Sequence, residues 1–328
     1  MTLRDSFGRV ATDLRLSLTD RCNLRCTYCM PADGLAWMPR EEQLTDDEVV
    51  RLVHIAVTRL GVDEVRLTGG EPTVRPHLVD IVARLSDLRP RPRLSMTTNG
   101  TSLTRLAGAL RAAGLDRVNV SLDTLSADRY LAITNRDRLA DAQAGLAAAV
   151  AAGLTPVKVN AVLLRGVNDD EAPALLRWCL DRGYALRFIE QMPLDPQHSW
   201  NRGVMVTGAE ILASLRTEFT VTALSGRGSA PAEVFAVDGG PGTVGVIGSV
   251  TAPFCAACDR VRLTADGQVR SCLFAREETD LRVAMRAGAD DARLAALWVA
   301  AVRGKRAGHG IDGPAFVQPV RPMSAIGG

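Results

Sequence analysis

Residues 14–31 read LRLSLTDRCNLRCTYCMP, a short β-like run followed at once by three cysteines at the spacing C-x3-C-x2-C. The run LRLSL is typical of a strand, and Cys22, Cys26 and Cys29 fall in the loop behind it. In a barrel of parallel strands, active sites collect at the C-terminal ends of the strands. The stretch therefore predicts that the first strand presents a cysteine cluster at the functional edge of the fold.

Downstream of this stretch, β-like and helix-like segments alternate as far as residue 192. The further β-like runs are 64–70, 93–100, 117–122, 156–164 and 185–192. The helix-like segments are 45–60, 76–88, 103–113, 137–152 and 170–182, with stop signals at Gly61, Gly114, Gly153 and Gly183. Strands separated by helices of this length pair in parallel through right-handed crossovers. Six strands are fewer than the eight of a closed barrel, so we expect an α/β fold with a partial (β/α)6 TIM-type barrel. An open doubly wound sheet is the alternative.

The pattern changes after residue 193, and we expect two domains, 1–192 for the partial barrel and 193–328 for a C-terminal region that closes it. A helix is expected over 207–219, a Gly-, Pro- and Ser-rich connection over 225–242 and a strand over 244–250. A hairpin should turn at Asp266-Gly267, and a long helix should cover 278–303. The tail from 309 to 328 reads as irregular.

Composition excludes several classes of function. The 328 residues are 47% hydrophobic and 23% charged, with a net charge of +2, so no global basic field marks a nucleic-acid binder. No apolar run reaches the length of a membrane span, and the N-terminal MTLRDSFGRV lacks the apolar core of a signal peptide. The expected compartment is the cytoplasm. Only two of the cations are lysines, Lys158 and Lys305.

Coordination number guides the interpretation of the first cysteine group. A closed structural zinc site needs four ligands, whereas this loop offers three thiolates, and the first histidine in the chain is His54. Three thiolates suit a four-iron cluster with one iron left open to a small molecule. A zinc knuckle or a redox-active set of thiols is the alternative.

A second group, Cys255, Cys258 and Cys272, again lacks a fourth ligand. We interpret it as a second four-iron cluster with an open iron; a zinc site, closed by Cys179 or by a histidine, is the alternative. Cys179 itself lies in a helical segment and reads as a small buried hydrophobe. Arg260 and Arg262 alternate along the hairpin beside this cluster, so both should lie on one face.

Three cations lie on predicted strands that face one cavity. Lys158 alternates with Val157 and Val159, and Arg15 and Arg66 lie on the first and second strands. A cation that points into a barrel is costly unless it meets an anion or its stem reaches the barrel mouth. Together the three would suit a polyphosphate, which makes a nucleoside triphosphate the natural ligand.

The motif C-x3-C-x-Tyr-C, followed by LTGGEP at 67–72, resembles the radical S-adenosylmethionine (SAM) superfamily. With FCAACDRVRLTADGQVRSCL at 254–273 and MSAIGG at 323–328, the resemblance narrows to the GTP 3′,8-cyclase family of molybdenum cofactor biosynthesis and spans nearly the whole chain. Asp13 stands where this family commonly has an aromatic residue, and Asp259 where it commonly has Asn. Neither departure removes a ligand.

The resemblance implies a role for each matching residue. Two [4Fe-4S] clusters are held by Cys22, Cys26, Cys29, Cys255, Cys258 and Cys272. SAM is contacted by Tyr28, Gly70, Ser121 and Met192. GTP is contacted by Arg15, Arg66, Thr97, Lys158, Arg260, Val261 and Arg262. Arg15, Gly327 and Gly328 take part in catalysis, and the two glycines can thread a narrow channel because they lack side chains.

The implied reaction is a radical cyclisation. A 5′-deoxyadenosyl radical takes the 3′-hydrogen of GTP, C3′ attacks guanine C8, and reduction gives 3′,8-cyclo-7,8-dihydro-GTP. The implied partners are a flavodoxin- or ferredoxin-type electron donor, a pterin synthase that receives the product, and a second copy of the chain in a homodimer. We expect no nucleic-acid or membrane partner. A two-cluster peptide maturase is the close alternative, and a redox-sensing metal protein is the distant one.

Overall fold

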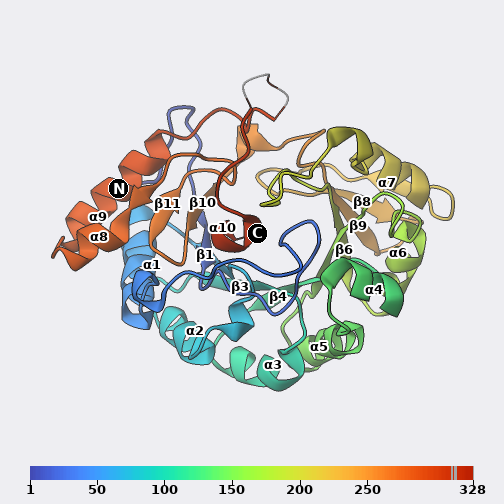
Figure 1. The fold of residues 1–328 in the computed structure, drawn as a ribbon, viewed down its shortest axis with the longest axis horizontal. Coiled ribbons are helices and arrows are strands. Elements are labelled where there is room, and N and C mark those ends of the chain that lie inside the picture. The colour runs from blue at the N-terminus through green and yellow to red at the C-terminus, as the bar shows by residue number, and fades with distance from the viewer. Residues whose placement is uncertain (312, 314–315, 328) are drawn as a thin grey trace.

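The computed structural model describes residues 1–311, 313 and 316–327. Its strands line the inside of a ring and most of its helices cover the outside, with the short C-terminal helix α10 in the middle (Figure 1). Among the described residues, no helix combines the length and apolar character that a membrane crossing would need.

The first half of the chain confirms all six predicted strands. These are β1 (Asp13–Ser17), β2 (Glu64–Thr68), β3 (Arg93–Thr98), β4 (Arg117–Ser121), β5 (Lys158–Val162) and β6 (Ala185–Ile189). Each pairs in parallel with the next. The helices between them are α1 (Asp46–Leu60), α2 (Leu78–Ser86), α3 (Leu103–Ala112), α4 (Ala127–Thr134), α5 (Leu139–Ala151) and α6 (Ala172–Asp181).

Local chemistry explains where these helices begin and end. In α1, Thr45 and Glu48 form a capping box, and Gly61 ends the helix in the left-handed conformation at φ 79°. The helix α4 was not predicted. It is eight residues long, begins at the Ser126 cap and ends at Asn135, which adopts φ 55°.

The second half departs from prediction in three places, the first being a short helix, Met323–Ile326, in the tail that was expected to be irregular. Its elements are α7 (Gly208–Leu215), β7 (Val221–Ala223), β8 (Glu233–Val237), β9 (Thr243–Ile247), β10 (Arg260–Leu263), β11 (Gln268–Arg270), β12 (Thr279–Asp280), α8 (Leu281–Arg286), α9 (Asp291–Arg303) and α10 (Met323–Ile326). The stretch 225–242 contains β8, and the helix expected over 278–303 is divided into β12, α8 and α9, with Gly288 at φ 90° between the helices. The hairpin at Asp266-Gly267 is confirmed, since β10 and β11 pair in antiparallel fashion around Gly267 at φ 79°.

All strands belong to one sheet in the order β12-β11-β10-β1-β2-β3-β4-β5-β6-β9-β8-β7. The partial barrel is confirmed and is longer than the six predicted strands, because β10 adds in parallel to β1 and β9 adds in parallel to β6. The sequence did not reveal this extension, because strand partners far apart in the chain leave no local pattern.

The two faces of the barrel strands differ in chemistry. Leu14 and Leu16 of β1 are fully buried in the apolar core between sheet and helices, as are their neighbours Val65 and Leu67 of β2. The alternate positions, such as Arg15, therefore point to the inside of the ring. The interior is thus polar and can hold a ligand.

Candidate active site

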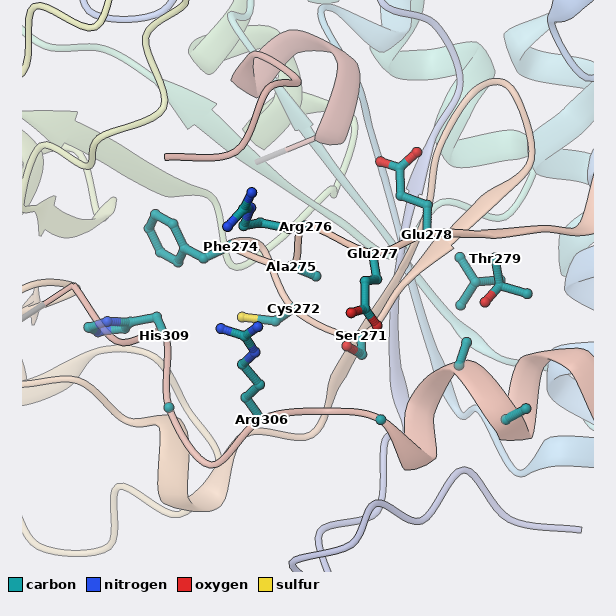
Figure 2. A pocket seen from close by; sticks show the side chains of 15 residues that line it. Ser271, Cys272, Phe274, Ala275, Arg276, Glu277, Glu278, Thr279, Arg306 and His309 are labelled. Carbon is teal, nitrogen blue, oxygen red and sulfur yellow. The ribbon is translucent and has the colours of Figure 1, made fainter. Parts of the chain in front are cut away.

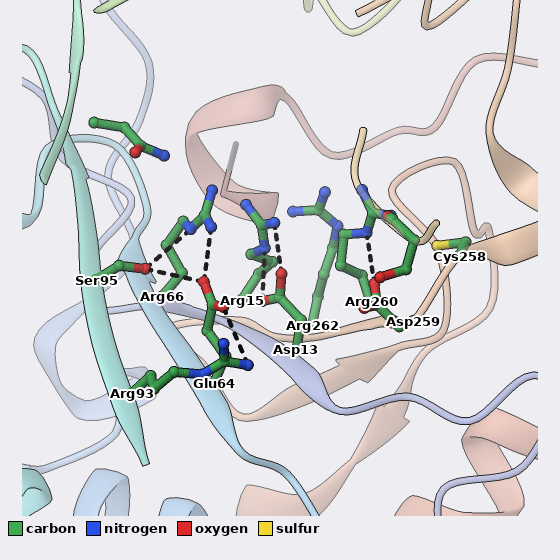
Figure 3. Close-up of polar contacts among 12 residues, drawn as sticks. Asp13, Arg15, Glu64, Arg66, Arg93, Ser95, Cys258, Asp259, Arg260 and Arg262 are labelled. Carbon is green, nitrogen blue, oxygen red and sulfur yellow. Dashed lines mark hydrogen bonds and ion pairs between the residues drawn. The ribbon is translucent and has the colours of Figure 1, made fainter. Parts of the chain in front are cut away.

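Strand register places a row of cations on the inner face of the barrel. Arg15 lies opposite Arg66 of β2 on one side and opposite Arg262 of β10 on the other. Figure 3 shows the guanidinium groups of Arg66, Arg15, Arg262 and Arg260 side by side on one side of the sheet. All four residues are buried. Burial and the neighbouring Arg15 lower the pKa of Arg66 and of Arg262 to about 9. The row is therefore short of negative charge.

Acidic side chains at the base of the row give partial compensation. Asp13 accepts two hydrogen bonds from Arg15, at 3.0 and 2.8 Å. Glu64 pairs with Arg66 at 2.9 Å (Figure 3). Burial would raise the pKa of Asp13, but Arg15 and other cations hold it below its ordinary value. Asp13, one of the two departures from the family pattern, therefore orients a guanidinium of the row.

The cationic lining continues along the barrel to Lys158. Asn119 of β4 lies opposite both Thr97 of β3 and Lys158 of β5, so Thr97 and Lys158 belong to the same face. Burial, followed by the charges of Arg187 and Arg117, lowers the pKa of Lys158 to about 7. Arg117 and Arg187 were not among the predicted site residues. Their signal was available, since both alternate with apolar residues on predicted strands.

The first cysteine group occupies the loop after β1, as predicted. Cys22, Cys26 and Cys29 are partly buried. Burial raises the pKa of the Cys22 thiol to about 11. It also raises the pKa of Cys29, to about 12, although a hydrogen bond from the backbone of Ser324 lowers that pKa in part. Three thiolates here need a cationic partner, and an iron cluster supplies one.

The second group lies beside the outer end of the arginine row. Cys255, Cys258 and Cys272 border one cavity together with Arg260 and Arg262. Among the thiols, that of Cys258 has a lowered pKa: burial raises it, but Lys305 and Arg260 outweigh that effect. Cys272 also lines an outer pocket, whose lining includes Arg306 (Figure 2).

Each cysteine group offers three thiols, the number that holds a four-iron cluster with one iron left open. Among the described side chains, no three His, Cys, Asp or Glu residues are placed to hold one metal ion together. A zinc ion would need its thiolates to converge on one point. In a four-iron cluster each thiolate binds its own iron.

The C-terminal segment connects the two cysteine groups. The backbone of Ser324 reaches Cys29, Ser17 donates a hydrogen bond to the carbonyl of Ile326 at 3.0 Å, and Arg262 donates one to the carbonyl of Gly327. Four consecutive residues, 324–327, thus run from the first group to the wall of the second group's cavity. We call the interior space that residues 324–327 occupy between the two groups the chamber. Gly328 lies outside the described residues.

A side chain at Gly327 would not fit in the chamber. Its φ is 84°, and an added Cβ would overlap Ser17 Oγ and would lie 2.6 Å from Thr68 Cγ2. Both atoms belong to the C-terminal ends of barrel strands. The close approach explains why glycine is needed at this position.

The residues expected at SAM divide between two places. Gly70 donates its N–H to Thr19 O at 2.8 Å, in the loop that leads to the first cysteine group, and a Cβ there would lie 2.6 Å from Asp20 O. Tyr28 donates its hydroxyl hydrogen to Asp123 at 2.8 Å, two residues beyond Ser121 at the end of β4. Met192, by contrast, borders the cavity of the second group.

Two further residues complete the description of the site. The side chain of Val261 is fully buried in the apolar core and points away from the chamber, so only its backbone could reach a ligand there. Glu71 was not predicted to have a role. It is 1% exposed and accepts from Thr98 Oγ1 and Asn99 N, each at 2.7 Å, so it joins the ends of β2 and β3. The signal was its place in the Gly-Gly-Glu-Pro loop.

Comparison with known proteins gives matches over almost the whole length. Residues 16–179 match the Radical SAM superfamily, and residues 184–311 match Molybdenum Cofactor Synthesis C. A protein of Streptomyces coelicolor named GTP 3′,8-cyclase is 66% identical over 328 residues, covering 99% of this chain and 96% of its own. One of Mycolicibacterium smegmatis with the same name is 60% identical over 331 residues, covering 99% and 92%.

Solved structures agree on the fold. The crystal structure of Streptococcus suis SuiB bound to precursor peptide SuiA matches with a TM-score of 0.61 at 12% identity, covering 90% of this chain and 67% of that one. The structure of SuiB bound to S-adenosylmethionine matches with a TM-score of 0.60. At such low identity these likenesses support the architecture alone.

Proposed function

The chain belongs to the GTP 3′,8-cyclase family of the radical SAM superfamily, and from this premise we propose that its chamber binds GTP through the arginine row and Lys158. The reaction joins C3′ of the ribose to C8 of guanine and gives 3′,8-cyclo-7,8-dihydro-GTP. The single observation that supports this assignment best is the inward-facing row of buried cations that ends beside the second cysteine group.

The roles of the cysteines follow from their positions. Cys22, Cys26 and Cys29 would hold one [4Fe-4S] cluster, and Cys255, Cys258 and Cys272 would hold the other. When bound, the first cluster supplies the electron that cleaves SAM. Tyr28, Gly70, Ser121 and Met192 are the proposed contacts of SAM, although Met192 borders the cavity of the second group.

The proposed GTP contacts are assigned by their place in the row. Arg15, Arg66, Thr97 and Lys158 would hold the triphosphate, because they lie on the same face of β1, β2, β3 and β5 and phosphate oxygens accept from forked guanidinium groups. Arg260, Arg262 and the backbone of Val261 would hold the guanine end beside the second cluster.

Three residues are proposed to take part in catalysis. Arg15 lies in the middle of the row, where it can orient the substrate. Gly327 and Gly328 would exclude water from the reacting carbons, a role that the hydrogen bond between Arg262 and Gly327 O supports for the first of them.

A direct test is anaerobic turnover. Protein reconstituted with iron and sulfide, then reduced with dithionite in the presence of SAM and GTP, should release 5′-deoxyadenosine and the cyclised nucleotide in equal amounts. ATP in place of GTP should give no cyclised product. SAM cleavage that is insensitive to GTP would contradict the assignment and favour the peptide maturase alternative, whose substrate needs no triphosphate site.

We further propose the division of the chain at residue 192, with SAM chemistry in 1–192 and the guanine end in 193–328. The proposed compartment is the cytoplasm, because all seven cysteines are unpaired and disulfides are rare there. A flavodoxin- or ferredoxin-type donor, a pterin synthase that takes the product, and a second copy of the chain are the proposed partners. Reduction by purified flavodoxin in place of dithionite tests the first of these.

A further inference from the structure

Lys305 is a buried lysine in a chain that otherwise relies on arginine. It follows the C-terminus of α9 and is 4% exposed. Its backbone N–H bonds to Val302 O at 2.9 Å, and Val302 and Trp298 are packed in the apolar core. The base of the side chain is therefore fixed by a rigid helix end.

The ammonium group of Lys305 donates all three of its hydrogens to acceptors of Cys258 and Arg260. Nζ donates to Arg260 O at 2.8 Å, to Cys258 O at 3.2 Å and to Cys258 Sγ at 3.3 Å. An ammonium has three donors, so its hydrogen bonds are complete. Two of the three acceptors belong to Cys258.

The charge of the ammonium is not balanced by an acid. Within the described part of the chain, no carboxylate forms an ion pair with Lys305, whereas Arg15, Arg66 and Arg260 of the neighbouring row each have such a partner. A buried, unpaired cation is costly unless an anion meets it. The anion that the geometry offers is the sulfur of Cys258, a proposed cluster ligand.

We propose that Lys305 is a positioning residue that sets the reduction potential of the second cluster through its charge and its N–H···S hydrogen bond. Reduction adds one electron to the cluster and no proton, so a fixed positive charge at a ligand sulfur favours the reduced form. Net charge and hydrogen bonds to sulfur are established determinants of such potentials. The inference rests on the proposed second cluster, and it does not depend on GTP as the substrate.

The test compares midpoint potentials in the full-length chain. Replacing Cys22, Cys26 and Cys29 by Ser leaves only the second cluster, whose reduced form is followed by electron paramagnetic resonance during a titration with dithionite. Lys305→Met should lower the midpoint so that, at the midpoint of the parent, the ratio of reduced to oxidised cluster falls about tenfold, equivalent to about 59 mV for one electron. Lys305→Arg should retain most of the parent's potential.

A control separates direct contact from general charge. Arg303 is an exposed cation in the last turn of α9, and Arg303→Met removes a charge close by in the sequence. It should leave the midpoint unchanged. An intact second cluster with the parent's midpoint in Lys305→Met would overturn the proposal, as would an equal shift in Arg303→Met.

Iron content provides a readout if the Met variant does not assemble its cluster. Lys305→Gln then keeps an N–H donor without the charge. Loss of the cluster from the Met and Gln variants, but not from Lys305→Arg, supports the proposal, because of the three only Arg retains the positive charge. Loss from all three overturns it, since the role would then be packing. The iron content of the same variants is then measured in the chain with all cysteines present, so that the result also holds for the holoenzyme. Normal iron content in the parent shows that a failure of the proposal is not a failure of the cluster assignment.

Discussion

The guanidinium of Arg262 donates a hydrogen bond to the backbone carbonyl of Gly327. Arg262 lies on β10, beside the second cysteine group. Gly327 belongs to the C-terminal segment 324–327, which begins beside the first group. The bond therefore holds the segment inside the chamber, between the two proposed clusters.

Substitution at Gly327 tests the importance of this placement. Gly327→Ala introduces a Cβ that overlaps Ser17 Oγ, at a residue whose φ of 84° disfavours a side chain. Residues 324–327 should therefore no longer occupy their position in the chamber. We expect formation of cyclised product to fall about 10²-fold, the scale of a misplaced positioning group. Product is measured by chromatography, and iron content should not change.

The matched control is Gly108→Ala. Gly108 lies within α3, and a Cβ there meets nothing within 4 Å. Turnover of Gly108→Ala should equal that of the parent. If Gly327→Ala also turned over at the parent's rate, the position of residues 324–327 would not matter for the reaction.

GTP binding should depend on pH through Lys158. Its pKa is lowered to about 7 in the free protein by burial and by nearby cations, and a bound triphosphate would raise it. The protonated form is the one that binds, so affinity is highest below pH 7. Between pH 7.5 and 9 the dissociation constant should rise, by at most about tenfold per unit for one proton.

Isothermal titration in two buffers of different ionisation enthalpy measures this proton uptake. Lys158→Arg should bind GTP without the pH slope, because its charge persists. Lys158→Met should bind weakly at every pH. A wild-type slope that persists in Lys158→Met would assign the proton to another group.

Iron content separates the ligand cysteines from the structural one. Cys26→Ala and Cys258→Ala should each lose about half of the bound iron, one four-iron cluster of two. Cys179→Ala should lose none, because Cys179 is fully buried in the apolar core. Iron is measured by colorimetric assay after anaerobic reconstitution, and equal loss in Cys179→Ala would contradict the assignment.

Glu190 is predicted to matter for stability. It is fully buried after β6, and its carboxylate accepts from Gly208 N at 2.7 Å, Val250 N at 2.8 Å and Thr251 N at 2.9 Å. In Glu190→Gln the amide would face these donors, and unfolding free energy should fall by about 2–3 kcal/mol. Urea unfolding measures the change, with the exposed Glu210→Gln as a control expected to cost under about 1 kcal/mol.

Local pattern predicted the elements whose signal lies within the element itself. The alternation of Arg15 and Arg66 with leucine and valine gave both the strands and the inward-facing cations. The turn at Asp266-Gly267 could be predicted because the glycine that favours it lies within the turn. The helix α4 was missed because it is short, and β8 because glycine, proline and serine surround it.

Other features depend on distant partners and could not be predicted. The pairing of β10 with β1 places Arg262 opposite Arg15, and no local pattern indicates that register. Val261 shows that position in the sequence does not fix which group of a residue faces the chamber. Its sequence neighbours are both in the row, yet strand alternation turns its side chain into the core.

The order of the strands has a consequence for how ligands enter. The parallel strands run from β10 to β9 without these two pairing, in the part of the chain that is described, so the wall has a seam. A ligand that enters at this seam breaks no strand-to-strand hydrogen bonds, because the described strands β9 and β10 do not pair. Ligand entry there would require movement of side chains and connecting loops alone, while the paired strands that align the reacting atoms stay in place.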